Sequence, residues 1–384
     1  MLITPKYVSL DTATLGRLAK DFWSGREQRR SEAQHFIDEL SELNVCIILS
    51  LTHLRELFRH ECDQIVRDRF AFLARLPMIA WPRPYDRSWF TGAMTDIGAA
   101  ELHSFVHDGV RELAAIRDRV RENIWETGVG SDMFVADNEV WEPFIHQCRE
   151  SLEKDRYVVS FSRTDPSGVN GRTIGEIKQE ILVAPTDLDQ CARRLAGDLA
   201  KQVRSSGDKN IKDVDQQALD FAIQTRNRVR AMLDRGEEFT SQVCEHFGVP
   251  ECLANDDMTL GELGELGTLT EKLNVIGRNL RPPVEVNLLD VPPESLPMLT
   301  FDRALHQIQQ SADRVAGSDL GDASFACLSM YADATEVDKR TAEYLNRVQR
   351  SGSPITHLIG PLFKTTEPSM LLPRIREALE ESGR

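Results

Sequence analysis

The sequence predicts an α/β protein whose central parallel sheet is interrupted by a mostly helical insertion. Short apolar runs alternate with amphipathic helical patterns in residues 1–85, and the same alternation returns in residues 300–384. Residues 86–299 instead show one helical pattern after another. We therefore expect the two ends of the chain to form one α/β domain, with residues 86–299 inserted into it.

The first half of the predicted domain begins with two strands. Residues 7–10 form a short apolar strand that is followed at once by Asp11, and a helix is predicted at residues 28–43. Residues 45–51 (VCIILSL) are continuously apolar rather than alternating, which is typical of a strand covered on both faces. Glu56 lies one turn into the helix after this strand. We therefore expect Glu56, like Asp11, near the carboxyl end of a strand.

A third strand is predicted at residues 78–81 (MIAW), where Pro82 and Pro84 end it. The sequence then becomes mostly helical, and residues 157–161 (YVVSF) are one possible strand within this part. Residues 281–297 contain the pair PP twice and lose the helical period, so we expect the chain to return to its first domain there.

The second half of the predicted domain alternates again. A helix is expected at residues 301–315, a short buried strand at residues 335–337 and a last strand at residues 354–359 (PITHLI). A helix near residues 372–379 closes the domain.

The acids of residues 318–344 have two interpretations. In the first, Asp319 or Asp322 caps the start of a helix. Asp333 then lies in a turn, and Asp338 starts the next helix. In the second interpretation, the preceding strand delivers Asp338 to the carboxyl edge of the sheet, beside the helix start that carries Asp322. Active sites of open α/β sheets lie at that edge.

The charge of the chain limits the partners it can have. With 41% apolar and 28% charged residues the chain has a globular composition, and its formal net charge is −15. An acidic chain is not a general binder of phosphate backbones, so we expect any contact with nucleic acid to be local and assisted by a metal. Arginines near Glu56 either line an RNA path or occupy a solvated helix face. They are Arg55, Arg59, Arg67, Arg69 and Arg75.

The cysteines and the apolar runs indicate the compartment. The seven cysteines are an odd and scattered set, as in proteins whose thiols stay reduced. No signal peptide and no run long enough to span a membrane is recognised. We therefore expect a cytoplasmic protein without a membrane partner.

The terminal halves together place a set of carboxylates at the carboxyl edge of the sheet. They are Asp11, Glu56, Asp319, Asp322 and Asp338. So many carboxylates at close range raise each other's pKa unless a cation balances them. Oxygen ligands without nearby Cys or His favour Mg²⁺ or Mn²⁺. Such ions suit phosphoryl chemistry, because they activate a water and stabilise the leaving oxygen.

The acids stand in the short motifs YVSLDTATL, LTHLREL, SDLGDASFACLSMYAD and TEVDKR. In this order they resemble the PIN-domain nucleases, and more narrowly the bacterial PIN-like proteins with a large helical insertion. The resemblance covers about residues 1–85 and 300–384, and it implies a three-layer α/β/α domain. PIN domains are metal-dependent ribonucleases, many of them toxins of toxin–antitoxin systems or RNA-processing enzymes.

The resemblance also implies roles for single residues. The acids that would be catalytic and hold Mg²⁺ or Mn²⁺ are Asp11, Glu56, Asp322 and Asp338. Asp319 would hold an outer-shell water. Thr12, Lys339 and Arg340 would meet the substrate, although solvated surface charge is the alternative for the two basic residues. The expected substrate is RNA, with single-stranded DNA as the second choice.

A second function stays open at this point. The chain is then a non-catalytic PIN-like or regulatory protein in which the acids are structural. Its helical insertion would bind a protein partner or mediate self-association.

Overall fold

The structure is a computed structural model that describes residues 4–84, 91–135, 139–161, 164–183, 187–235, 238–310 and 319–382. Within these residues, six strands form one sheet in the order β4-β3-β2-β1-β5-β6. All neighbouring strands are parallel except β4, which runs antiparallel to β3. The strands are β1 (Lys6–Ser9), β2 (Val45–Ile48), β3 (Ile79–Pro82), β4 (Trp125–Gly128), β5 (Ala334–Glu336) and β6 (Leu362–Phe363).

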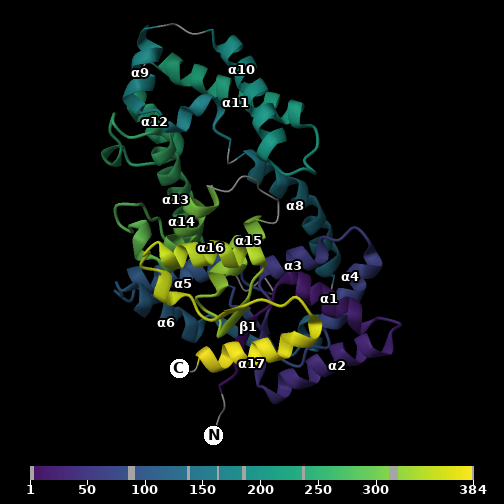
Figure 1. Ribbon diagram of the computed structural model, residues 1–384. Coiled ribbons are helices and arrows are strands. Elements are labelled where there is room, and N and C mark those ends of the chain that lie inside the picture. The colour runs from purple at the N-terminus through teal and green to yellow at the C-terminus, as the bar shows by residue number, and fades with distance from the viewer. Residues whose placement is uncertain are drawn as a thin grey trace.

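Helices cover both faces of the sheet (Figure 1). Val45 and Ile47 of β2 belong to one hydrophobic cluster, and Cys46 and Ile48 belong to the other, so both faces of this strand are buried. The first cluster is built with α1 (Thr12–Phe22), α2 (Glu27–Glu42), α3 (Leu51–Phe58), α4 (Asp63–Leu73), α7 (Gly130–Met133), α8 (Trp141–Phe161) and α17 (Leu371–Ser382). The second is built with α5 (Met94–Val106), α6 (Leu113–Asn123), α13 (Leu260–Asn279), α14 (Pro297–Gln310), α15 (Asp319–Leu328) and α16 (Lys339–Arg350). The predicted α/β class is confirmed, and the sheet, which was predicted to be parallel, is mostly so.

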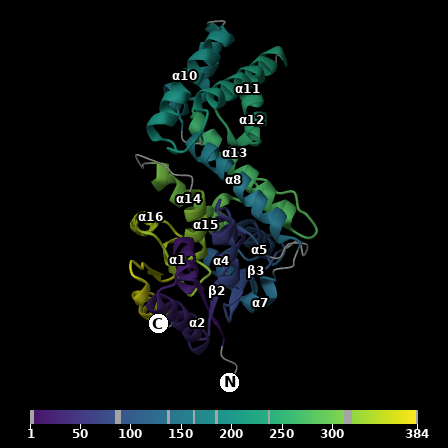
Figure 2. The ribbon, with the colours of Figure 1, turned by 90° about the vertical axis from the view of Figure 1, so that its right-hand side faces the viewer.

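Part of the middle of the chain extends away from the sheet as a helical arm (Figures 1 and 2). The arm consists of α9 (Ile174–Val183), α10 (Leu188–Ser206), α11 (Val214–Arg235) and α12 (Phe239–Phe247). It has small hydrophobic clusters of its own, and α8 and α13 connect it to the body. Short 3₁₀ helices lie at Pro166–Gly171, Glu251–Leu253, Pro293–Ser295, Thr356–Leu358 and Pro368–Met370.

Two strand predictions are wrong. Residues 157–161 end helix α8, because Phe161 packs against α10 and α11 within the arm. Residues 354–359 contain a 3₁₀ helix, and Leu358 at its end and Ile355 just before its start are both buried, one turn apart. The last strand, β6, follows them.

The strand β4 was not predicted. It lies inside residues 86–299, which the sequence assigned to the insertion, yet it extends the sheet by pairing with β3. Its sequence is WETG, in which Trp125 is the one large apolar side chain, so it carries little strand signal. Helices α5 and α6 of the same range also pack on the sheet.

The order in which strands are added to the sheet reverses at β1. The strands β2 and β3 follow β1 on one side of it, and β5 and β6 lie on its other side. In open α/β sheets, ligands bind outside the carboxyl ends of the strands at such a switch point. The end of β1 beside the end of β5 is therefore the place where the fold itself predicts a site.

No helix in the described part of the chain is long and apolar enough to cross a membrane. All seven cysteines lie in the described ranges, and each is free.

A buried acid ties the second helical layer together. Glu101 of α5 accepts hydrogen bonds from the Met298 N–H at the start of α14, at 3.0 Å, and from the Tyr331 hydroxyl after α15. Its side chain is fully buried. Burial raises the pKa of Glu101 from 4.5 to about 8, against the opposing effect of the two hydrogen bonds.

The raised pKa of Glu101 predicts a pH dependence of stability. The folded state keeps the proton up to about pH 8, whereas the unfolded state releases it near 4.5. The free energy of unfolding should therefore fall as the pH rises between these values. Glu101→Gln should flatten this fall, which urea unfolding at about pH 5 and about pH 8 measures. An equal fall in wild type and variant would show that Glu101 is ionised in the folded protein.

Candidate functional site

The end of β1 is fixed to α3 by a buried histidine. The Nε2–H of His53 donates to the Leu10 carbonyl at 3.1 Å, and its Nδ1 accepts the Ser50 N–H at 3.1 Å. Because a carbonyl only accepts, these partners assign the proton to Nε2. Ser50 caps α3, and its hydroxyl lies 2.8 Å from Nδ1. Burial lowers the pKa of His53 to about 4, so the ring is neutral.

Asp11 follows β1 as predicted, and it lies beside the end of β5. Its carboxylate caps α1 by accepting the Ala13 N–H at 2.7 Å. Its own N–H donates to Glu336 Oε2 at 3.2 Å, and the Thr14 hydroxyl donates to Glu336 Oε1 at 2.9 Å. Glu336 is the last residue of β5. The two neighbouring strands at the switch point thus bring two carboxylates together.

Glu56 reaches the same edge from α3. Its Oε2 accepts the Thr12 hydroxyl at 2.5 Å, and its Oε1 lies 3.9 Å from the Arg59 guanidinium. A Cβ at Gly321 would come within 2.0 Å of Glu56 Oε1. The absence of a side chain at Gly321 therefore lets this carboxylate approach α15.

Asp322 and Asp338 complete the group. Asp322 lies on α15 and accepts from Arg340 Nη2 at 3.0 Å. Asp338 caps α16 by accepting the Thr341 N–H at 2.6 Å. Lys339 is exposed at the start of that helix. Asp319 begins α15, but its side chain lies outside the described residues.

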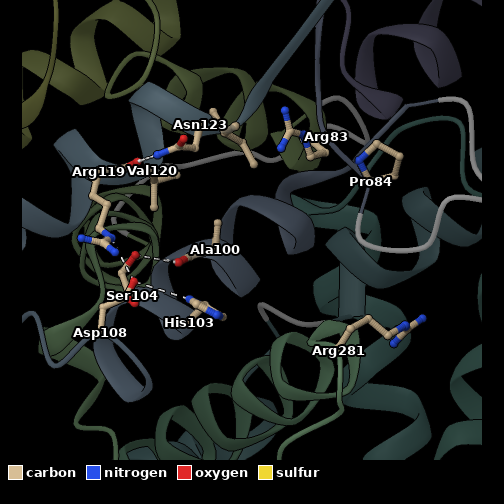
Figure 3. Close-up of a pocket in the computed structure, with 11 residues that line it drawn as sticks. Arg83, Pro84, Ala100, His103, Ser104, Asp108, Arg119, Val120, Asn123 and Arg281 are labelled. Atoms are coloured by element: carbon tan, nitrogen blue, oxygen red, sulfur yellow. Dashed lines mark hydrogen bonds and ion pairs between the residues drawn. The ribbon is translucent and has the colours of Figure 1, made fainter.

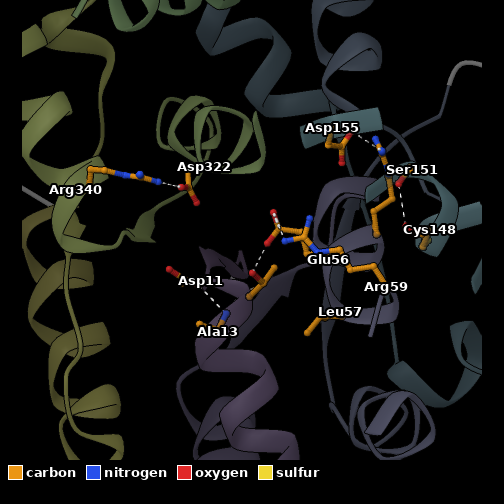
Figure 4. Close-up of polar contacts among 12 residues, drawn as sticks. Asp11, Ala13, Glu56, Leu57, Arg59, Cys148, Ser151, Asp155, Asp322 and Arg340 are labelled. Carbon is orange, nitrogen blue, oxygen red and sulfur yellow. Dashed lines mark hydrogen bonds and ion pairs between the residues drawn. The ribbon is translucent and has the colours of Figure 1, made fainter. Parts of the chain in front are cut away.

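The carboxylates of Asp11, Glu56 and Asp322 surround a common space (Figure 4). Burial and then the charges of Asp338 and Glu56 raise the pKa of Asp322 to about 7. Burial also raises the pKa of Glu336 to about 7, with a contribution from Asp11. Burial raises the pKa of Asp11, and the charge of Asp338 raises it further. Burial likewise raises the pKa of Glu56, with a contribution from the charge of Asp11. The acids are therefore close enough to repel one another.

The donor set suits a hard cation. It consists of carboxylate oxygens with the Thr12 hydroxyl beside them, which is the ligand chemistry of Mg²⁺ and Mn²⁺. In the described ranges, however, no group of three or more His, Cys, Asp or Glu residues is arranged closely enough to hold an ion. An ion would have to draw the carboxylates together, and their mutual repulsion would be relieved when it did so.

Sequence reasoning missed Glu336. The sequence places Glu336 in the short strand before Asp338, but its partners Asp11 and Thr14 are too distant in the chain to be recognised from the sequence. The available signal was an acid inside a segment predicted to be buried, since such an acid needs a partner. Asp333, by contrast, is structural as predicted: it accepts the Tyr7 N–H at 2.8 Å and pairs with Arg121 at 2.7 Å.

A cavity of about 570 Å³ lies away from these acids, between α5, α6 and the segment that follows α13 (Figure 3). Its polar side chains are largely paired with one another. Asp108 lies 2.9 Å from Arg119 and 3.5 Å from His103. The cavity contains none of the predicted site residues, so the switch point remains the candidate site.

The neutral state of His53 predicts an acid sensitivity. Its pKa is about 4 in the folded state and 6.5 without burial, so the unfolded state takes up a proton first as the pH falls. The free energy of unfolding should therefore decrease from about pH 6.5 to about pH 4. His53→Gln keeps a donor and an acceptor but cannot titrate, so its unfolding curve should change less over this range. An unchanged pH dependence in the variant would show that His53 is charged in the folded protein.

Comparison with known proteins adds no relative. No family model, no curated protein and no solved structure matches this chain. The candidate function therefore rests on the geometry of the site and on the motif resemblance.

Proposed function

We propose that this chain is a metal-dependent, PIN-like nuclease that hydrolyses phosphodiester bonds in RNA. One observation carries the proposal. The carboxylates of Asp11 after β1, Glu56 on α3, Asp322 on α15 and Glu336 at the end of β5 lie at the switch point of a mostly parallel sheet. They lie close enough there to raise each other's pKa. Repulsion of this kind costs stability, and an anionic site with oxygen ligands gains most from a divalent cation. The setting we propose is a cytoplasmic toxin or defence enzyme.

Individual residues have separate roles in this proposal. Asp11, Glu56, Asp322 and Asp338 would hold Mg²⁺ or Mn²⁺, and the bound ion would supply charge neutralisation and an activated water. Glu336 positions Asp11 through the Asp11 N–H, and Thr12 orients Glu56 through its hydroxyl.

The basic residues next to the acids serve the substrate. Arg340 places a positive charge beside Asp322. Lys339 is exposed and adds a second charge at the start of α16. Both would attract the phosphate backbone to an otherwise acidic surface.

A specific observation favours a second candidate function, a catalytically inactive scaffold. Asp11 and Asp338 already cap helices, and Asp322 already pairs with Arg340. Leu219 and Phe221 on α11 of the arm are exposed, at 38% and 39%, and would suit a protein partner or a second copy of the chain. In this case the acids would serve only to stabilise the fold.

Cleavage of labelled RNA distinguishes these functions. With Mn²⁺, the wild type should cleave single-stranded RNA, and Asp11→Asn or Asp338→Asn should lower kcat/KM by about 100-fold or more, because each removes one charge of the metal site. Asp38→Asn, an exposed acid on α2, is the matched control and should cleave like the wild type. Single-stranded DNA is tested in parallel. Cleavage that is unaffected by both site substitutions would exclude this site, and no cleavage by the wild type would favour the scaffold.

Gly321→Ala tests the metal site without changing an acid. The added Cβ would displace the Glu56 carboxylate, which it approaches to 2.0 Å. Calorimetric titration should show that affinity for Mn²⁺ falls by about tenfold or more. Gly197→Ala in α10 is the control, because its Cβ meets nothing within 4 Å. Equal Mn²⁺ affinity in the two variants would contradict a ligand role for Glu56.

A further inference from the structure

A small cavity adjoins the acid cluster. It lies on the side of Glu56 that faces away from Asp11 (Figure 4). It has a volume of about 110 Å³ and lies between α3, α8 and α15. We call it the arginine pocket and define it by Arg55, Arg59, Asp155, Ser151 and Gly321, with Glu56 as the wall it shares with the acid cluster. Figure 4 shows Arg59 and Asp155 on this side of Glu56.

The lining of the arginine pocket is rich in hydrogen-bond donors. Arg55 lies in the last turn of α3, and Arg59 is the residue that follows the helix, one turn later, so their guanidinium groups lie on the same side of α3. The hydroxyl groups of Thr52 and Ser324 also line the cavity, and so does that of Ser151, which already donates to the Cys148 carbonyl at 2.9 Å. Guanidinium and hydroxyl donors around a small volume are the chemistry that recognises a phosphate oxyanion.

The size of the pocket limits its occupant. Its volume is about 110 Å³, against about 570 Å³ for the cavity between α5 and α6. A single tetrahedral oxyanion matches this size better than a nucleobase with its sugar. The pocket therefore suits one phosphate group of a longer chain, not a whole nucleotide.

The ion pairs of the pocket are weak enough to be exchanged. Arg55 pairs with Asp155 at 3.4 Å, and its side chain is 42% exposed. Arg59 is 3.9 Å from Glu56, which is the outer limit of an ion pair. A partly exposed pair such as Arg55–Asp155 contributes little to stability, so a bound anion can take the place of Asp155 beside Arg55.

Positive charge is also crowded around the pocket. Arg69 of α4 donates to the Leu57 carbonyl at 2.6 Å, and its buried Nε has no hydrogen-bond partner among the described residues. Burial and then the charge of Arg59 lower the pKa of Arg69. An anion near Arg59 would relieve this repulsion.

We propose that the arginine pocket binds a backbone phosphate of single-stranded RNA next to the phosphodiester that lies at the acid cluster. This inference rests on the proposed nuclease function and adds the contact that places the substrate. It also gives the middle of the chain a role, because Ser151 and Asp155 come from α8, the helix that leads into the arm.

Binding of a fluorescein-labelled single-stranded RNA, measured by fluorescence anisotropy at several salt concentrations, tests the pocket. The Asp338→Asn protein serves as the background, so that the RNA stays intact. Arg55→Ala and Arg59→Ala should each weaken binding by about tenfold. Each should also weaken the salt dependence of binding: the negative slope of log K against log salt should become smaller in magnitude by about 0.7.

Two further variants separate the pocket from general charge effects. Asp155→Asn removes the acid that competes for Arg55, so it should strengthen binding, an outcome that damage to the fold cannot imitate. Arg67→Ala removes an exposed arginine of α4 outside the pocket and should change affinity by less than about twofold. Equal effects of Arg59→Ala and Arg67→Ala, or weaker binding by Asp155→Asn, would overturn the proposal.

The outcomes also separate the pocket from the nuclease function. If Arg55 and Arg59 set RNA affinity but the wild type cleaves no RNA, the pocket stands and the proposed function fails. If cleavage depends on Asp11 but is unchanged by Arg55→Ala and Arg59→Ala, the nuclease stands and the pocket fails.

Discussion

The candidate site depends on how the end of β1 is held. The Leu10 carbonyl accepts from His53 of α3, and the N–H of the next residue, Asp11, donates to Glu336 of β5. One peptide group is thus bonded to the elements on both sides of the switch point. These bonds use backbone groups that lie beyond the last ladder pair of the strand, where they would otherwise be unsatisfied. The position of Asp11 is therefore coupled to Glu336 and to α3, the helix that carries Glu56.

The sequence could place Asp11, Glu56 and Asp338 in the fold because their positions follow from local rules. A continuously apolar run fixes a buried strand, and the first carboxylate after it must lie at the carboxyl edge. Asp11 and Glu56 were placed in this way. For Asp338 the two interpretations were not exclusive, since it follows β5 and also caps α16. A residue that ends a strand and starts a helix satisfies both patterns.

The parts that could not be predicted depend on partners distant in the sequence. Glu336 lies at the candidate site because its carboxylate accepts hydrogen bonds from Asp11 and Thr14, which are more than 300 positions away in the sequence. The strand β4 is a strand because β3 offers it an edge, not because WETG has a strand pattern. Gly321 looks like an ordinary small residue, and its importance appears only when the Glu56 carboxylate is placed against it. In each case the local signal was weak and tertiary contact decided the outcome.

The arrangement of charge is compatible with the proposed binding of RNA by an acidic chain. The net charge of −15 repels RNA at long range, but screening limits that repulsion to about 10 Å at moderate salt. Close to the acids, Arg55 and Arg59 line the arginine pocket beside Glu56, and Arg340 lies beside Asp322. A cation among the acids would cancel the nearest negative charges and leave these arginines as the local field. Metal binding and RNA binding should therefore strengthen each other, since each neutralises the charge that opposes the other.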